Sequence, residues 1–159
     1  MDAGTKVLLR QREIGPEVEL AVKNSIQEME KIHEAVEAFA ARYQLSAKLA
    51  FNFSLILEEL VVNIISYGYD DDEEHEILVR MWADEQWFRV QIDDGGRSFN
   101  PLCDSPEPMI DLSVQDRPIG GVGIHLTKEL MDDVKYQRIY GRNIVTLGKR
   151  RDAGDGDRR

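Results

Sequence analysis

Apolar residues recur at helical spacing in two consecutive stretches of the chain. In the first, the capping-box sequence Ser25-Ile26-Gln27-Glu28 precedes apolar residues that repeat every three to four positions up to Tyr43, which predicts an amphipathic helix. In the second, Ser46 is placed to cap a helix that ends near Gly68. Residues 55–67 are almost wholly apolar, so this second helix is expected to be buried on most of its surface.

Shorter apolar runs of strand length lie on both sides of these helices. They predict a leading hairpin around Gly15-Pro16, an antiparallel hairpin after the second helix, and a further hairpin around Tyr140-Gly141-Arg142. This order of elements predicts an α+β fold, a two-layer sandwich with an antiparallel or mixed sheet and helices on one face. The expected strands are residues 7–9 with 18–22, 76–82 with 87–93, and 133–138 with 143–149.

The segment from Gly95 to Gly123 has no periodicity and is rich in proline and glycine. A loop of this length inside a compact domain is usually functional, so a lid or binding loop is expected here. It leads into an expected helix over residues 122–131 whose first turn is rich in glycine. Residues 150–159 are charged and have nothing to bury, so we expect one domain over residues 1–149 followed by a disordered tail.

The charge and cysteine content narrow the classes of partner. With a formal net charge of -10, the chain is repelled by nucleic acid and by anionic membrane surfaces, so neither is expected as its main partner. The single cysteine, Cys103, excludes an internal disulfide, and the histidines lack metal-ligand spacing. No apolar run is expected to approach membrane-spanning length. These features predict a cytoplasmic protein without structural zinc.

Polar residues interrupt the apolar second helix on a single stripe. Glu59, Asn63 and Ser66 fall at positions i, i+4 and i+7 of that helix. A carboxylate and a carboxamide in an otherwise apolar helix cost folding free energy unless something pairs with them. Two interpretations stay open from this helix alone: the partner is a bound ligand, or internal hydrogen bonds with the backbone satisfy Glu59 and Asn63.

Two further stretches carry acidic or glycine residues beside the expected element ends. Residues 93–99 follow a strand, and residues 120–123 precede a helix. Each is compatible with a plain turn, while N–H groups exposed at a helix N-terminus also bind anions. The glycines lack the lysine and hydroxyl residue of a Walker A loop, and Leu126 stands where a dinucleotide fingerprint needs a glycine. Neither of these two nucleotide-binding motifs is present, so a nucleotide site of a third kind remains open.

Four sequence boxes follow one another along the chain: Glu59-x-x-x-Asn63, Asp94-x-Gly96-Arg97-Ser98-Phe99-Asn100-Pro101, residues 117–124 and residues 140–147. They resemble the boxes of the GHKL ATPase superfamily, in order and at plausible spacing, and the resemblance runs from about Ser46 to Lys149. The fit is best to the small anti-sigma-factor serine kinases of the RsbW and SpoIIAB type, which implies a Bergerat-type ATP-binding fold with an ATP lid. Residues 1–45 fit the leading strands and helix of such a domain without a specific motif.

The resemblance implies ATP and Mg²⁺ as cofactors and gives roles to the helix and the box that follows it. Asn63 supplies a side-chain oxygen to Mg²⁺, and Glu59, one turn earlier, acts as general base on the attacking hydroxyl or water. Asp94 accepts a hydrogen bond from the adenine amino group, and Gly96 leaves room for the base. Arg97 is interpreted as a solvated loop residue.

The later boxes supply the rest of the implied nucleotide site. Gly121 and Gly123 let backbone N–H groups approach the phosphates, and Arg117 reaches a terminal phosphate from the lid. Phe99 belongs to the cofactor-binding set, and Thr146 is placed near the adenine edge. The implied site therefore draws on the central helix, two strand ends and the lid.

The function implied by the resemblance is that of a protein-serine/threonine kinase. Its substrate is an anti-sigma-factor antagonist of the STAS type, with a sigma factor as a further partner, and a homodimer is expected. The alternative is a regulatory module in which ATP occupancy controls partner binding without phosphoryl transfer. His33-Glu34 suggests a sensor histidine kinase, but His33 is interpreted as a surface residue of an amphipathic helix.

Overall fold

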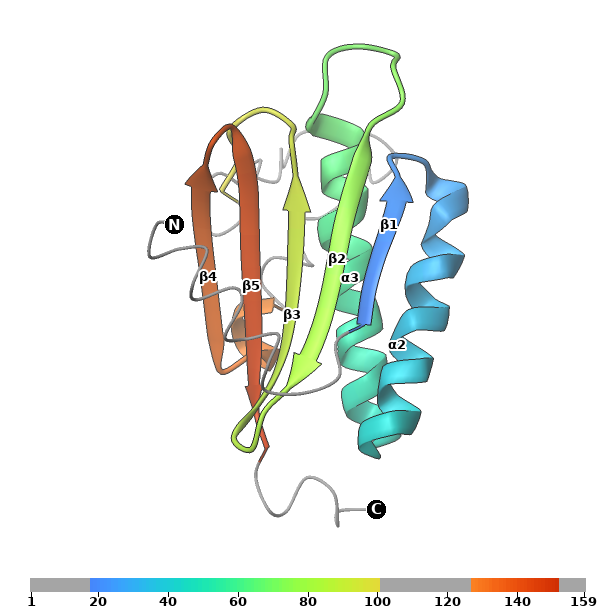
Figure 1. Ribbon diagram of the computed structural model, residues 1–159, viewed down its shortest axis with the longest axis vertical. Helices are drawn as coiled ribbons and strands as arrows, with labels where there is room; N and C mark the ends of the chain where they lie inside the picture. The colour runs from blue at the N-terminus through green and yellow to red at the C-terminus, as the bar shows by residue number, and fades with distance from the viewer. Residues whose placement is uncertain (1–17, 101–126, 152–159) are drawn as a thin grey trace, which may run out of the picture.

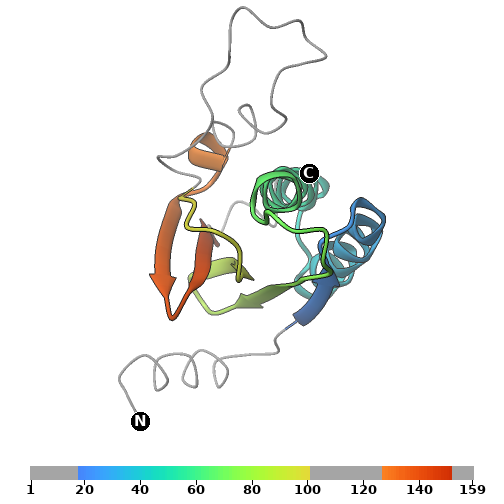
Figure 2. The same ribbon diagram turned by 90° about the horizontal axis from the view of Figure 1, so that it is seen from above.

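The computed structural model describes residues 18–100 and 127–151. Its elements form two layers, a five-stranded antiparallel sheet and two long helices that cover one face of it (Figure 1). Figure 2 shows both helices on the same side of the sheet. The predicted α+β architecture is therefore confirmed. The elements are β1 (Val18–Lys23), η1 (Ile26–Glu28), α2 (Met29–Tyr43), α3 (Ala47–Tyr67), β2 (Glu76–Ala83), β3 (Trp87–Asp94), β4 (Asp133–Ile139) and β5 (Arg142–Arg150).

The strand order β1-β2-β3-β5-β4 places β3 at the centre of the sheet. The last residue of β3, Asp94, pairs with Ile77 of β2 on one side and with Asn143 of β5 on the other. Both later hairpins are present as predicted, β2 with β3 and β4 with β5. Of the expected leading hairpin, β1 pairs with β2, and residues 7–9 lie outside the described residues.

The hydrophobic core lies between the helices and the inner face of the sheet. Side chains alternate along each strand, so every second residue of β2, β3 and β5 points into this core. The same alternation sends Asp94 and Asn143 to the inner face, at the end of the sheet where β3 stops and β5 starts. Inner-face residues of the core include Val79, Met81, Val90, Ile92, Val145 and Leu147.

Helix α2 is amphipathic as predicted, but it begins differently. Residues 26–28 form a 3-10 turn, and the Ser25 side chain makes no capping hydrogen bond. Its hydroxyl contacts the Gln27 side chain instead. The capping-box prediction is therefore wrong, although the helix itself is confirmed. Its buried residues are Met29, Ile32, Val36 and Phe39.

Helix α3 begins at the predicted cap, since the Ser46 hydroxyl oxygen accepts a hydrogen bond from the Leu49 N–H at 3.1 Å. With 21 residues it is long and apolar enough, by length and composition alone, to cross a membrane. The expectation that no apolar run approaches this length is therefore wrong. Phe53 and Leu57 are fully buried in the core beneath the helix, which accounts for the apolar character of α3 as that of a core helix.

Three predicted segments overlap only in part with the described residues. Residues 127–130 are helical, which covers one portion of the helix predicted over 122–131. Arg150 is the last residue of β5, and the Arg151 N–H donates to the Gln86 carbonyl at 2.8 Å, so the predicted tail does not begin at residue 150. Residues 101–126, with most of the expected lid, and residues 152–159 lie outside the described residues.

Candidate functional site

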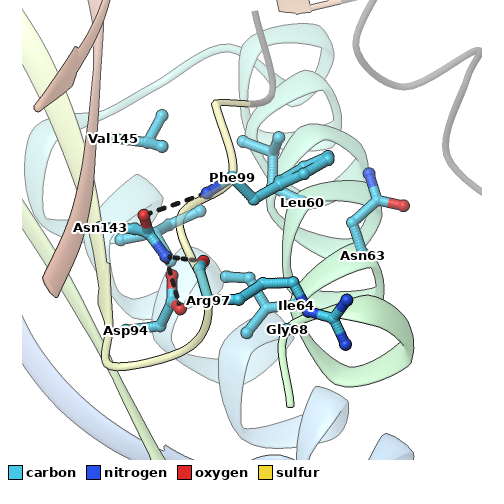
Figure 3. Close-up of a pocket in the computed structure, with 10 residues that line it drawn as sticks. Leu60, Asn63, Ile64, Gly68, Asp94, Arg97, Phe99, Asn143 and Val145 are labelled. Carbon is cyan, nitrogen blue, oxygen red and sulfur yellow. Dashed lines mark hydrogen bonds between the residues drawn. The ribbon is translucent and has the colours of Figure 1, made fainter. Parts of the chain in front are cut away.

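A small cavity lies between the C-terminal half of α3 and the strands β3 and β5. Its volume is about 20 Å³, which is room for about one water molecule. Figure 3 shows Asp94 and Asn143 on the sheet side and Asn63 on α3, with Phe99 between them. A ligand as large as a purine therefore needs lining side chains such as Phe99 to move. The lining residues are Leu60, Asn63, Ile64, Gly68, Ile92, Asp94, Arg97, Phe99, Asn143 and Val145.

Asp94 brings a nearly buried carboxylate to the cavity, with 4% of its surface exposed. One carboxylate oxygen, Oδ2, accepts hydrogen bonds from the Gly96 N–H at 2.9 Å and from Nδ2 of Asn143 at 3.1 Å. The other oxygen, Oδ1, has no hydrogen-bond partner among the residues that the structure describes. Burial raises the pKa of Asp94 above its ordinary value. The arrangement leaves one oxygen available to accept a hydrogen bond from a ligand.

Asn63 brings a carboxamide that is only 2% exposed. Neither its oxygen nor its nitrogen has a hydrogen-bond partner within the described ranges. An unpaired buried polar group costs about 1–3 kcal/mol of folding free energy. Of the two interpretations that the sequence left open, internal hydrogen bonding therefore finds no support for Asn63, and a ligand is favoured. An unpaired side-chain oxygen also fits the oxygen ligands that Mg²⁺ prefers.

Glu59 lies one helical turn before Asn63 on the same face of α3, but it does not line the cavity. Its side chain is partly exposed. Burial raises the pKa of Glu59, and the neighbouring negative charge of Glu58 raises it further. A carboxylate with a raised pKa is a stronger proton acceptor than an ordinary one, which suits a general base.

Position 96 requires glycine because the backbone here lies close to the Gly68 carbonyl group. A Cβ at this position would lie 2.6 Å from the Gly68 carbonyl oxygen and 2.9 Å from Oδ2 of Asp94. The next residue, Arg97, donates its backbone N–H to the same Gly68 carbonyl at 2.8 Å. The expected reason for this glycine was room for a base, whereas the neighbours found here are the end of α3 and the Asp94 carboxylate. Arg97 also lines the cavity, while its half-exposed guanidinium pairs with Asp70.

Thr146 does not line the cavity, so the structure does not bring it together with the other described residues of the predicted site. It lies on the opposite face of the sheet, where its hydroxyl oxygen accepts a hydrogen bond from Nε2 of Gln91 at 3.1 Å. Asn143 and Val145 of the same strand face the cavity instead. Sequence reasoning missed Asn143, although its odd-numbered spacing from Thr146 along a strand already places the two side chains on opposite faces.

The remaining predicted residues fall into two groups. Phe99 lines the cavity, and its backbone N–H donates to the Asn143 side-chain oxygen at 3.4 Å. Arg117, Gly121 and Gly123 lie outside the described residues, so their predicted contacts with phosphates stay predictions. The structure thus brings together Asn63, Asp94 and Phe99 from the predicted set.

Comparison with known proteins adds a family and several relatives. Residues 22–149 match the histidine kinase-like ATPase domain. The serine/threonine-protein kinase BtrW of Bordetella bronchiseptica is 29% identical over 112 residues, covering 70% of this chain and 78% of BtrW. The serine-protein kinase RsbW of Listeria monocytogenes is 26% identical over 114 residues, covering 70% of this chain and 73% of RsbW.

One solved structure supports the fold. The crystal structure of RsbU and RsbW domains from a Mycobacterium tuberculosis protein superposes with a TM-score of 0.61 at 14% sequence identity. The match covers 85% of this chain but only 32% of the longer one. At this identity the similarity shows a shared fold and nothing about activity.

Proposed function

Because this chain belongs to the family of histidine kinase-like ATPase domains, we propose that it is an ATP-dependent protein-serine/threonine kinase of the anti-sigma-factor type. Its proposed substrate is an anti-sigma-factor antagonist of the STAS type, with a sigma factor as a second partner. The names of the kinases to which it is similar support phosphoryl transfer. The net charge of -10 supports protein partners over nucleic acid. A homodimer in the cytoplasm completes the proposal.

The observation that carries the proposal is the buried amide of Asn63, which has no hydrogen-bond partner among the described residues and lies one turn from Glu59. We assign its oxygen to Mg²⁺, which when bound neutralises charge on the nucleotide phosphates. Glu59 takes the proton of the attacking hydroxyl, a role that its raised pKa supports. Asp94 accepts a hydrogen bond from the adenine amino group, next to Gly96 and Phe99.

The phosphate end of the nucleotide is assigned to residues outside the described ranges. Backbone N–H groups at Gly121 and Gly123 approach the phosphates, and Arg117 contacts the terminal one. These assignments rest on the sequence boxes alone. They complete a site whose base-binding end lies between α3 and the sheet.

A second candidate function is an ATP-binding switch that changes partner affinity without phosphoryl transfer. The observation that favours it is the position of Glu59, which is not among the residues that line the cavity. In that case Glu59 orients water or stabilises the helix, and Asn63 and Asp94 still bind the nucleotide.

Incubation with γ-labelled ATP, Mg²⁺ and a purified STAS-type antagonist protein tests the first proposal against the second. A kinase transfers label to a serine or threonine of the antagonist, and a variant antagonist lacking that hydroxyl takes up none. A switch binds ATP and the antagonist without transfer. Absence of label on several candidate antagonists, at ATP concentrations that saturate binding, would contradict the kinase proposal.

A further inference from the structure

The Asn143 side chain makes several hydrogen bonds at the edge of the cavity. It is 3% exposed and lies directly opposite Asp94 in the register of β3 and β5. Both ends of its amide are engaged, the oxygen with one set of donors and the nitrogen with one set of acceptors. A buried side chain held at both ends has one orientation, and that orientation decides what its neighbours can bind.

The oxygen end is fixed by strand β4. Oδ1 of Asn143 accepts hydrogen bonds from the Tyr136 hydroxyl at 2.7 Å and from Nη1 of Arg138 at 2.9 Å. A guanidinium only donates, so the amide oxygen and not the amide nitrogen must face Arg138. Nη1 of Arg138 also donates to the Gly96 carbonyl at 2.9 Å, which holds the guanidinium in place.

The nitrogen end therefore faces Asp94. Nδ2 of Asn143 donates to Oδ2 of Asp94 at 3.1 Å and to the Arg97 carbonyl at 2.8 Å. Together with the Gly96 N–H at 2.9 Å, this gives Oδ2 two donors. The carboxylate is held at Oδ2, while Oδ1 has no hydrogen-bond partner among the described residues.

We propose that Asn143 is the positioning residue that makes this site specific for a 6-amino purine over a 6-oxo purine. By donating to Oδ2 it fixes Asp94 so that Oδ1 accepts a hydrogen bond from the exocyclic amino group. A 6-oxo purine places an acceptor against that oxygen, and both groups are then buried without a partner. The inference rests on the proposed nucleotide site and goes beyond it by naming how the base is selected.

The protonation state of Asp94 is a second reason why the loss of Asn143 should weaken the preference for a 6-amino purine. Burial raises the pKa of Asp94, and the hydrogen bond from Asn143 is the largest effect that lowers it. Loss of that donor favours the protonated acid. A protonated carboxyl group donates a hydrogen bond to a 6-oxo group, so discrimination between the two bases falls.

The test compares the dissociation constants of ATP and inosine triphosphate, which differ at the 6-position. Wild type is expected to prefer ATP by about 10-fold or more, and Asn143→Asp is expected to reduce that preference by about 10-fold. The Asp variant keeps an oxygen for Tyr136 and Arg138 but loses the donor to Asp94. Thr146→Val is the matched control, because it lies on the same strand with its side chain on the opposite face.

The outcomes separate this inference from the proposed function. An unchanged ATP preference in a folded Asn143→Asp protein, with both nucleotides weakened equally, overturns the specificity role and leaves the nucleotide site intact. Wild type that binds neither nucleotide overturns both. If the Asp variant does not fold, Arg138→Met removes the donor that orients the amide while keeping Asn143. It must also lower the preference for ATP, and an unchanged preference overturns the inference.

Discussion

At the scale of single residues, the cavity contains groups that weaken the fold. Asn63 has an amide without a hydrogen-bond partner in the described part of the chain, and Asp94 has a carboxylate whose charged form is disfavoured by burial. Such groups lower the free energy of unfolding, and functional sites commonly keep them because a ligand pairs with them. Replacing them should therefore stabilise the protein while removing ligand binding.

Asn63→Leu tests this for the helix side of the cavity. The apolar side chain removes an unpaired amide, so the free energy of unfolding should rise by about 1–3 kcal/mol. Mg²⁺-dependent ATP binding should weaken in calorimetry, because no other described residue supplies the same oxygen. Asn52→Leu, a less buried change on the same helix, is the control and should leave ATP binding intact. A destabilised Asn63→Leu protein with normal ATP binding would contradict the assignment.

Asp94→Asn tests the sheet side through its pH dependence. Burial, helped by the charge of Asp93, raises the pKa of Asp94 above its ordinary value. The native state then holds this proton more tightly than the unfolded chain does. Its contribution to stability is present below the ordinary aspartate pKa and is lost as pH rises through the raised pKa. Relative to Asp94→Asn, the wild type should lose stability across that window.

Urea unfolding at a series of pH values measures this difference. Asp72→Asn, an exposed change in the loop before β2, is the control for the removal of one carboxylate from the chain. A constant difference in the free energy of unfolding between wild type and Asp94→Asn over the same pH range would contradict a raised pKa for Asp94 in the native state.

At the scale of elements, helix α3 was predictable, whereas the choice of which face of β5 lines the cavity was not. The apolar pattern and the Ser46 cap are local properties, and both were confirmed. The residue of β5 that faces the cavity depends on how this strand aligns with β3, which is a contact between distant parts of the chain. Matching a motif to the sequence therefore placed Thr146 in the site, while the register places Asn143 there. The Ser25 cap failed because its hydroxyl contacts Gln27 instead of a backbone N–H.

Gly96→Ala tests the contact between the end of β3 and the end of α3. The added methyl group meets the Gly68 carbonyl at 2.6 Å, which is backbone and cannot move cheaply. Overpacking of this kind costs about 1–3 kcal/mol, and ATP binding should weaken as Asp94 shifts. Gly95→Ala is the matched control, since its nearest atom is Nη1 of Arg142 at 3.1 Å, the end of a flexible side chain. Equal melting temperatures for both variants would contradict the close approach.

At the scale of the whole molecule, the two layers bring the site together from separated segments. Helix α3 supplies Asn63, while β3 and β5 supply Asp94 and Asn143 from the sheet beneath it. The proposed general base, Glu59, lies one turn earlier on α3. The sequence predicted these layers because helix and strand periodicities are strong and local. It predicted the cavity only in part. The burial of Asn63, and its lack of a partner in the part of the chain that the structure describes, follow from packing and not from the sequence pattern. In the proposed kinase, the sheet holds the adenine, and helix α3 supplies the Mg²⁺ ligand and the general base.

The most direct test of the proposed function is Glu59→Gln, with Glu58→Gln as the matched control. The Gln side chain keeps the size of Glu59 but does not take a proton. ATP affinity and melting temperature should change little, while transfer to the antagonist should fall by roughly 10²-fold or more. Glu58→Gln keeps the proposed base and removes only the smaller of the two causes that raise the pKa of Glu59, so it should reduce transfer far less than Glu59→Gln does. A folded Glu59→Gln protein that binds ATP and phosphorylates the antagonist at the wild-type rate would contradict the kinase mechanism.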